Sequence, residues 1–111
     1  MIAITDTERQ LIHDIIVNRL PRCQVIAFGS RIKGTHVPAS DLDIAIIAND
    51  DVKVPVWDIR EDFMESDIPF KVDVLDYRAV SKAFQKIINN NFEVIFDTRL
   101  NTEAFGKGLF F

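Results

Sequence analysis

Short apolar runs of the β type alternate along this chain with segments of helical periodicity, and this alternation limits the possible folds more than any other feature. The runs are rich in β-branched and aromatic residues, as strands are, and they span Cys23–Phe28, Asp41–Ile47, Phe70–Tyr77 and Phe92–Phe96. Helical patterns cover residues 6–20, a stretch near Asp58, and residues 79–89. This order predicts an α+β (α/β-like) domain, with a mixed sheet of about four strands and helices packed on one face.

Several polar residues stand where helices are expected to begin. Thr5 and Glu8 have the spacing of a capping box, and Pro21 should end the helix that follows it. Asp58 is expected to cap the second helix, and Asp76 to cap the helix after the third strand. Asp76 is therefore assigned a structural role.

Length and composition indicate one domain over residues 1–111, with a motif-bearing core at about 6–96 and an apolar C-terminal tail at 98–111. The 111 residues are 48% hydrophobic and 27% charged, a globular balance. A net charge of -4 argues against a general nucleic-acid-binding surface, so any contact with phosphate must be local. Whether the apolar tail extends the core or forms an interface stays open.

The single cysteine, Cys23, provides neither a disulfide framework nor a cysteine-based metal site. The chain shows no basic and apolar leader, and no apolar run that approaches membrane-spanning length. The cytoplasm is therefore the expected compartment.

Three aspartates lie in strand-like runs at positions that suggest a shared site. Residues two apart in a strand point to the same face, so Asp41 and Asp43 should lie side by side. Asp73 occupies a similar place in the third run, and if the two strands are neighbours the three carboxylates converge. Oxygen ligands of this kind suit Mg²⁺.

The turn after the first strand offers the local phosphate contact that an acidic chain needs. Gly29 lets the backbone approach an anion, and Ser30 with the following amides can donate to phosphate oxygens. Arg31 and Lys33 add positive charge. We expect these four residues to bind nucleotide.

Together the carboxylates and the turn suggest nucleotidyl transfer. A nucleoside triphosphate, ATP above all, would rest its β and γ phosphates on the turn, while two metal ions held by Asp41 and Asp43 clamp the α phosphate and the attacking oxygen. Asp73 would hold or deprotonate the attacking hydroxyl group. The three aspartates are thus both the expected catalytic residues and the expected metal ligands.

The motif "GS", ten residues, then "DLD", with a later "VDV", resembles the nucleotidyltransferase signature of the DNA polymerase β superfamily. The forms "GSRIKGTHVPASDLDIAI" and "DIPFKVDVLDY" most resemble the minimal nucleotidyltransferases, over roughly residues 6–96. The resemblance implies a polymerase β-like fold, with Gly29 and Ser30 on the triphosphate and Asp41, Asp43 and Asp73 as the carboxylates. It also implies a small helical HEPN partner, for which the chain would act as an antitoxin that adenylylates a tyrosine of the toxin.

Plainer interpretations exist for each part of this pattern. A bare D-x-D can mark a strand with one solvated face, and Gly-Ser can mark an ordinary turn, but their combination favours the site. Trp57 and Tyr77 are interpreted as core or edge residues. Two other functions stay open: transfer to a small molecule, or a non-catalytic antitoxin that binds nucleotide or metal and neutralises its partner by complex formation.

Overall fold

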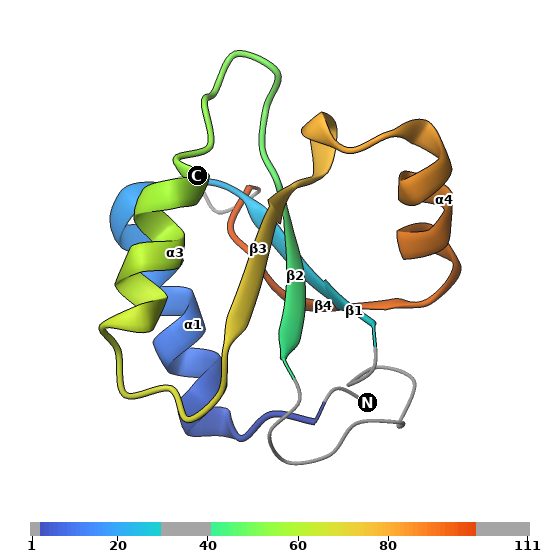
Figure 1. Ribbon diagram of the computed structural model, residues 1–111. Coiled ribbons are helices and arrows are strands. Elements are labelled where there is room, and N and C mark those ends of the chain that lie inside the picture. Colours follow the sequence, from blue (N-terminus) through green and yellow to red (C-terminus); the bar gives the residue numbers. More distant parts are fainter. Residues whose placement is uncertain (1–2, 30–40, 100–111) are drawn as a thin grey trace, which may run out of the picture.

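The computed structural model describes residues 3–29 and 41–99, which form a four-stranded sheet in the order β3-β2-β1-β4 (Figure 1). The strands are β1 (Gln24–Phe28), β2 (Leu42–Ile47), β3 (Val72–Asp76) and β4 (Phe92–Asp97). The helices are α1 (Asp6–Arg19), α3 (Val56–Met64) and α4 (Lys82–Asn90), with a 3₁₀ turn, η1 (Tyr77–Ala79), before α4. β1 runs antiparallel to β2 and β4, and β2 runs parallel to β3, so the predicted mixed α+β sheet is confirmed.

One face of the sheet is covered by α1 and α3. Alternate residues of β1, β2 and β3 point to this face, as the two-residue period of a strand requires. Together with the two helices they form the larger core, which includes Ile12, Ile16, Val25, Leu42, Ile44, Ile46, Ile59, Phe63, Val72 and Val74. Burial of these side chains is the main force that holds α1 and α3 on the sheet.

The opposite face carries α4. Ile88 of α4 is fully buried against Ile26, Phe28 and Ala45 of the sheet, and Phe84 packs against the same cluster. The expectation that all helices share one face is therefore wrong for α4, which lies across the sheet from α1 and α3 (Figure 1). The reason is that Ile26 and Phe28 of β1 and Ala45 of β2 are apolar on this second face, so both faces of the central strands need cover.

The helix boundaries follow local capping chemistry, with one departure from expectation. Thr5 and Glu8 form the predicted capping box, with Glu8 N donating to Thr5 Oγ1 at 3.0 Å and Thr5 N donating to Glu8 Oε1 at 2.9 Å. Asp58 does not cap α3, which begins at Val56 after Pro55 and has no side-chain cap. Proline has a fixed φ that suits a helix start, so the helix begins before Asp58, which stands in its first turn.

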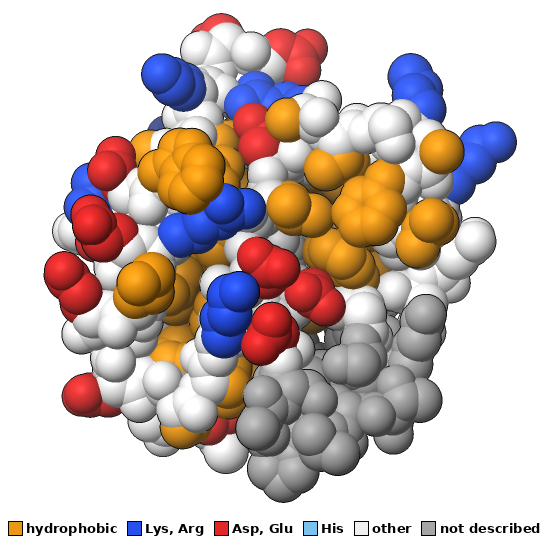
Figure 2. Space-filling view, in the orientation of Figure 1, with side chains coloured by type: hydrophobic (Ala, Val, Ile, Leu, Met, Phe, Trp, Pro, Cys, Tyr) orange, Lys and Arg blue, Asp and Glu red, His pale blue; other side chains and the backbone are white. Residues whose placement is uncertain are grey.

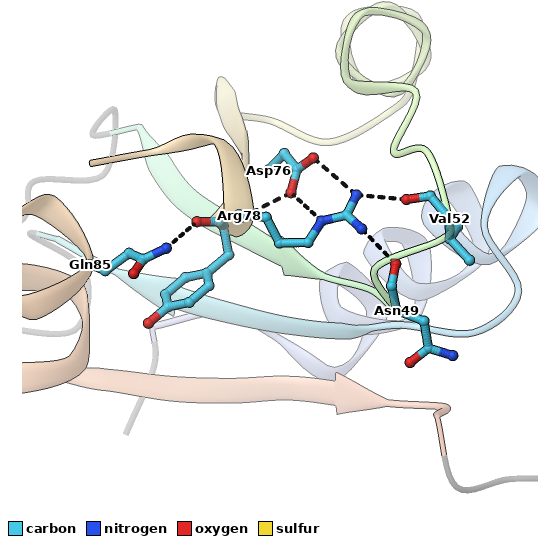
Figure 3. Close-up of polar contacts among 6 residues, drawn as sticks. Asn49, Val52, Asp76, Arg78 and Gln85 are labelled. Atoms are coloured by element: carbon cyan, nitrogen blue, oxygen red, sulfur yellow. Dashed lines mark hydrogen bonds and ion pairs between the residues drawn. The ribbon is translucent and has the colours of Figure 1, made fainter. Parts of the chain in front are cut away.

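The connection from β2 to α3 is fastened to the end of β3 by Arg78 (Figure 3). Its guanidinium donates to the carbonyl of Asn49 at 2.5 Å and to the carbonyl of Val52 at 2.6 Å, and it pairs with Asp76 at 3.2 Å. Asp76 also accepts a bond from the Arg78 amide as the cap of η1. The helix that Asp76 was expected to cap, α4, is instead capped by Ser81, because η1 lies between β3 and α4. This contact fixes the end of the sheet where β2 and β3 finish.

Among the helices described here, none combines the length and the apolar character that a bilayer crossing requires.

Candidate active site

The predicted carboxylates meet at the end of the sheet where β2 and β3 begin. Asp43 and Asp73 are direct neighbours in the parallel register of these strands, and Asp43 is also paired with Phe28, the last residue of β1. Asp41 is exposed just before β2, close enough to Asp43 for their charges to interact. Figure 2 shows acidic side chains gathered in the centre of this view, with a basic side chain beside them. The structure thus places Asp43 and Asp73 side by side, with Asp41 near Asp43.

These aspartates belong to the face of the sheet that α4 covers, but at the end that α4 leaves open. Asp43 and Ala45 are two apart on β2, and Ala45 is part of the cluster under α4. Asp73 and Leu75 have the same relation on β3, and Leu75 packs against that cluster. The site is therefore a corner of the sheet that borders the buried apolar cluster under α4 on one side and solvent on the other.

The electrostatics of Asp43 reflect that position. Burial raises the pKa of this half-buried carboxyl, and the negative charges of Asp73 and Asp41 raise its pKa further, whereas Lys71 acts to lower it. Like charges held this close favour either a shared proton or a bound cation. The corner therefore has the electrostatic character of a cation-binding site.

The donor set also fits a hard cation. Side-chain oxygens are the ligands that Mg²⁺ prefers, and this ion is usually held by one or two carboxylates, waters and substrate phosphates. Within residues 3–29 and 41–99, no group of three or more His, Cys, Asp or Glu side chains is placed to hold a metal ion by itself. Asp41, Asp43 and Asp73 could hold such an ion together with phosphate oxygens and water.

Gly29 brings the end of β1 directly against Asp43. Its φ is +86°, a backbone conformation that residues other than glycine rarely adopt. A Cβ atom built there would also collide with Oδ2 of Asp43. Two independent constraints therefore demand glycine at this position, and the predicted phosphate-binding turn starts beside the carboxylates. Ser30, Arg31 and Lys33 lie outside the described residues, so their nucleotide-binding roles stay predictions.

Lys71 and Arg60 are near the site and were not predicted from the sequence. Lys71 lines a pocket of about 470 Å³ together with Asp73 of β3 and Arg60 of α3. The sequence could have predicted that Lys71 lies near the site, because residues two apart in an extended chain, such as Lys71 and Asp73, point to the same side. Arg60 gave no such signal, since its position depends on how α3 packs beside β3.

The two aromatic residues interpreted as core or edge have different environments. Tyr77 packs against the α4 cluster and donates from its hydroxyl to Asn89 Oδ1 at 2.9 Å. Trp57 is 78% exposed on α3, so the expectation of a core or edge residue is wrong for it. Its ring lies under the Arg60 guanidinium, 4.9 Å from the ring centroid.

Comparison with protein families and with known proteins gives two matches. The family described as polymerase beta, nucleotidyltransferase, matches residues 10–100. A protein of Haemophilus influenzae, described as a probable protein adenylyltransferase MntA, is 39% identical over 93 residues, which cover 83% of this chain and 82% of the relative.

Solved structures share the fold. One is a toxin-antitoxin crystal structure with AMP-PNP, with a TM-score of 0.66 at 23% identity, covering 87% of this chain and 79% of the other. Another is a tri-AMPylated Shewanella oneidensis HEPN toxin in complex with an MNT antitoxin, with a TM-score of 0.59 at 20% identity, covering 92% of this chain and 80% of the other. At these identities the likeness concerns the arrangement of the sheet and helices.

Proposed function

The chain belongs to the polymerase β nucleotidyltransferase family, and from that premise we propose that it transfers AMP from ATP to a hydroxyl group of a partner protein. The observation that carries the proposal is the alignment of Asp43 with Asp73 across β2 and β3, with the Gly29 turn against Asp43. A phosphate-binding turn, a cation site and a candidate base then lie on three adjacent strands, in the order β1, β2 and β3.

The turn after β1 binds the donor in this proposal. The backbone at Gly29 approaches the β and γ phosphates closely because no side chain intervenes, and Ser30, Arg31 and Lys33 donate hydrogen bonds and positive charge. The α phosphate then lies over β2. The triphosphate therefore runs from the end of β1 toward the carboxylates.

Asp41 and Asp43, with Asp73, would hold Mg²⁺, with two ions as the proposed arrangement. When bound, the metal supplies positive charge that stabilises the charge developing on the transferred phosphate. The carboxylates would fix its place, because Asp43 is half-buried and its backbone is paired with Phe28 of β1 and Asp73 of β3.

Asp73 orients the acceptor hydroxyl and takes its proton as the bond to phosphorus forms. The hydroxyl oxygen attacks the α phosphorus, the bond from that phosphorus to the bridging oxygen of the β phosphate breaks, and pyrophosphate leaves with the electron pair. The products are pyrophosphate and an acceptor that carries one AMP group on its hydroxyl oxygen.

A HEPN-type protein is the proposed acceptor, and the chain is its antitoxin. Support comes from the Haemophilus relative, which is described as a probable protein adenylyltransferase, and from the fold shared with an MNT antitoxin in complex with an AMPylated HEPN toxin.

Intact-mass spectrometry tests the proposal directly. The chain, its HEPN partner and ATP are incubated with and without Mg²⁺, beside Asp43→Asn and Asp73→Asn, and beside Asp51→Asn as an exposed carboxylate control. We expect the partner to gain the mass of one or more AMP groups with the unmutated chain and with Asp51→Asn only, and only with Mg²⁺. A partner that forms the complex yet gains no mass would contradict the proposal and favour a small-molecule acceptor or neutralisation by binding alone.

A further inference from the structure

A pocket opens on the outer side of β3, next to the carboxylates. Its volume is about 470 Å³, and its walls include Arg60, Phe63 and Met64 of α3, together with Ile68, Lys71 and Asp73. Asp73 thus faces two spaces, the corner it shares with Asp43 and this pocket. A group bound in the pocket would lie within reach of the proposed base.

The order of the strands indicates which substrate the pocket serves, an inference that rests on the proposed function. In phosphoryl transfer the attacking and leaving oxygens lie roughly in line, on opposite sides of the phosphorus. The leaving pyrophosphate is assigned to the Gly29 turn at the end of β1, and Asp43 lies between that turn and Asp73. The attacking hydroxyl must then come from the β3 side, where the pocket is.

The pocket continues onto the outer face of α3. A second hollow of about 280 Å³ shares Arg60 and Met64 with the first and extends to Trp57. Trp57 is 78% exposed and Met64 is 81% exposed, and both are large apolar side chains. Figure 2 shows hydrophobic and basic side chains gathered over α3, close to the acidic side chains.

Arg60 gives this surface a fixed shape. Its Nη2 and Nε donate to the Val74 carbonyl on the outer edge of β3, at 2.8 and 3.2 Å. The same guanidinium lies over the Trp57 ring, 4.9 Å from its centroid. Because the arginine is anchored to the sheet, the aromatic ring is held in place as well, which lowers the entropy lost when a partner binds.

We propose that this continuous surface, from Trp57 and Met64 to the pocket at Asp73, is the docking site of the acceptor protein. A segment of that protein lies across Trp57 and Met64 with a large apolar side chain, and an adjoining hydroxyl side chain enters the pocket toward Asp73. A small-molecule acceptor would need the pocket alone, whereas exposed tryptophan and methionine beside arginine are the composition of a protein interface. Trp57 and Met64 therefore determine which acceptor is modified.

Trp57 is the only tryptophan in the sequence, so it can report on docking without interference. The Asp43→Asn chain is labelled with 5-fluorotryptophan and observed by fluorine NMR, and the HEPN partner is left unlabelled. We expect the single resonance to shift or broaden when the partner is added, and to keep its position when ATP and Mg²⁺ are added alone. A resonance whose position and width stay unchanged when the partner is added, although the complex forms, would overturn the inference.

Kinetics of transfer provide the second test. Trp57→Ala and Met64→Ala should each raise the KM for the partner at least ten-fold with kcat and ATP binding little changed, because both side chains are largely exposed on α3 and belong to neither the carboxylates nor the Gly29 turn. Ile87→Ala is the matched control, since Ile87 is 60% exposed on α4 and should leave the KM unaltered. Thermal melts of each variant establish that the fold is intact.

The outcomes separate this inference from the proposed function. If Trp57→Ala and Met64→Ala transfer AMP to the partner normally, or if only Ile87→Ala fails to do so, α3 is not the docking surface. The proposed activity would still stand in either case. A shifted fluorine resonance with no transfer to the partner would retain the docking surface and reject the proposed reaction.

Discussion

Gly29 links backbone geometry to chemistry at a single residue. Its positive φ ends β1, and the absence of a side chain lets Asp43 lie against the turn. The residue that ends β1 therefore also leaves room for Asp43, the carboxylate that we propose as a cation ligand.

We expect Gly29→Ala to lower the free energy of unfolding by about 1–3 kcal/mol, the usual cost of a non-glycine residue in such a conformation. Nucleotidyl transfer should be lost as well, because the new Cβ displaces Asp43. Urea denaturation and the mass assay measure the two effects. In a double-mutant cycle with Asp43→Ala, the part of the destabilisation that comes from the clash with the Asp43 side chain should disappear. Changes in the free energy of unfolding that are strictly additive would contradict the contact between the two residues.

The raised pKa of Asp43 makes its charge a source of instability at neutral pH. The folded protein binds the proton of Asp43 more tightly than the unfolded chain does. The contribution of Asp43 to the free energy of unfolding is therefore most favourable below the ordinary aspartate pKa of about 3.9, and it is lost as the pH rises through the pKa of the folded state. Asp43→Asn should therefore have a higher Tm than the unmutated protein at pH 7 without metal, and this difference should shrink as the pH falls toward 3.

Thermal melts over that pH range, with Asp51→Asn as control, measure this difference. Mg²⁺ with ATP should raise the Tm of the unmutated protein more than that of Asp43→Asn, because a bound cation offsets the charge. A lower Tm for Asp43→Asn at pH 7 would contradict the cause assigned to the pKa shift.

At the scale of elements, Arg78 joins the β2–α3 connection to η1. One guanidinium satisfies the carbonyls of Asn49 and Val52 and is itself held by Asp76. These contacts cross segments that no helix or strand ladder would otherwise connect. Arg78 therefore adds polar contacts to a connection whose Val52 and Val54 also pack on the larger core.

Arg78→Ala should lower the free energy of unfolding by about 2 kcal/mol, since hydrogen bonds of a charged group to the backbone are lost. Arg78→Lys should recover little of it, because an ammonium cannot reproduce the forked geometry. Urea denaturation gives the cost, and amide hydrogen exchange at Val52 should accelerate in both variants. Full recovery by lysine would show that charge alone matters.

The sequence predicts much at the scale of elements because the signals there are local. The capping box of Thr5 and Glu8 and the two-residue alternation around Asp43 and Asp73 depend on neighbours in the chain. The start of α3 was predicted at Asp58 because aspartate is a common cap, although Pro55 preceded it with an equally valid signal. Competing local signals are the reason for that error.

At the scale of the whole molecule, the sheet has a hydrophobic core on each face. Ile88 fills the smaller one beneath α4, whereas its neighbour Ile87 is 60% exposed. The helical spacing of α4 would be the same on either face, so the sequence could not place this helix. The pocket at Asp73 was equally inaccessible, because it exists only where α3 and the β3 edge meet in space.

The two adjacent isoleucines test this two-faced architecture. Ile88→Ala should lower the free energy of unfolding by about 2–5 kcal/mol, as expected for a buried aliphatic side chain. Ile87→Ala should change it by less than about 0.5 kcal/mol, since its side chain is largely in solvent. Urea denaturation of both variants provides the comparison, and equal costs would place α4 elsewhere.

The bonds from Arg60 to the Val74 carbonyl have a consequence for self-assembly. β3 is the outer strand on its side of the sheet, and an open strand edge is a template on which other chains add strands and aggregate. The charged Arg60 side chain already donates to the Val74 carbonyl on that edge, which disfavours the addition of a strand from another chain. The edge beside Asp73 can thus stay accessible to a partner without serving as a template on which copies of the protein polymerise.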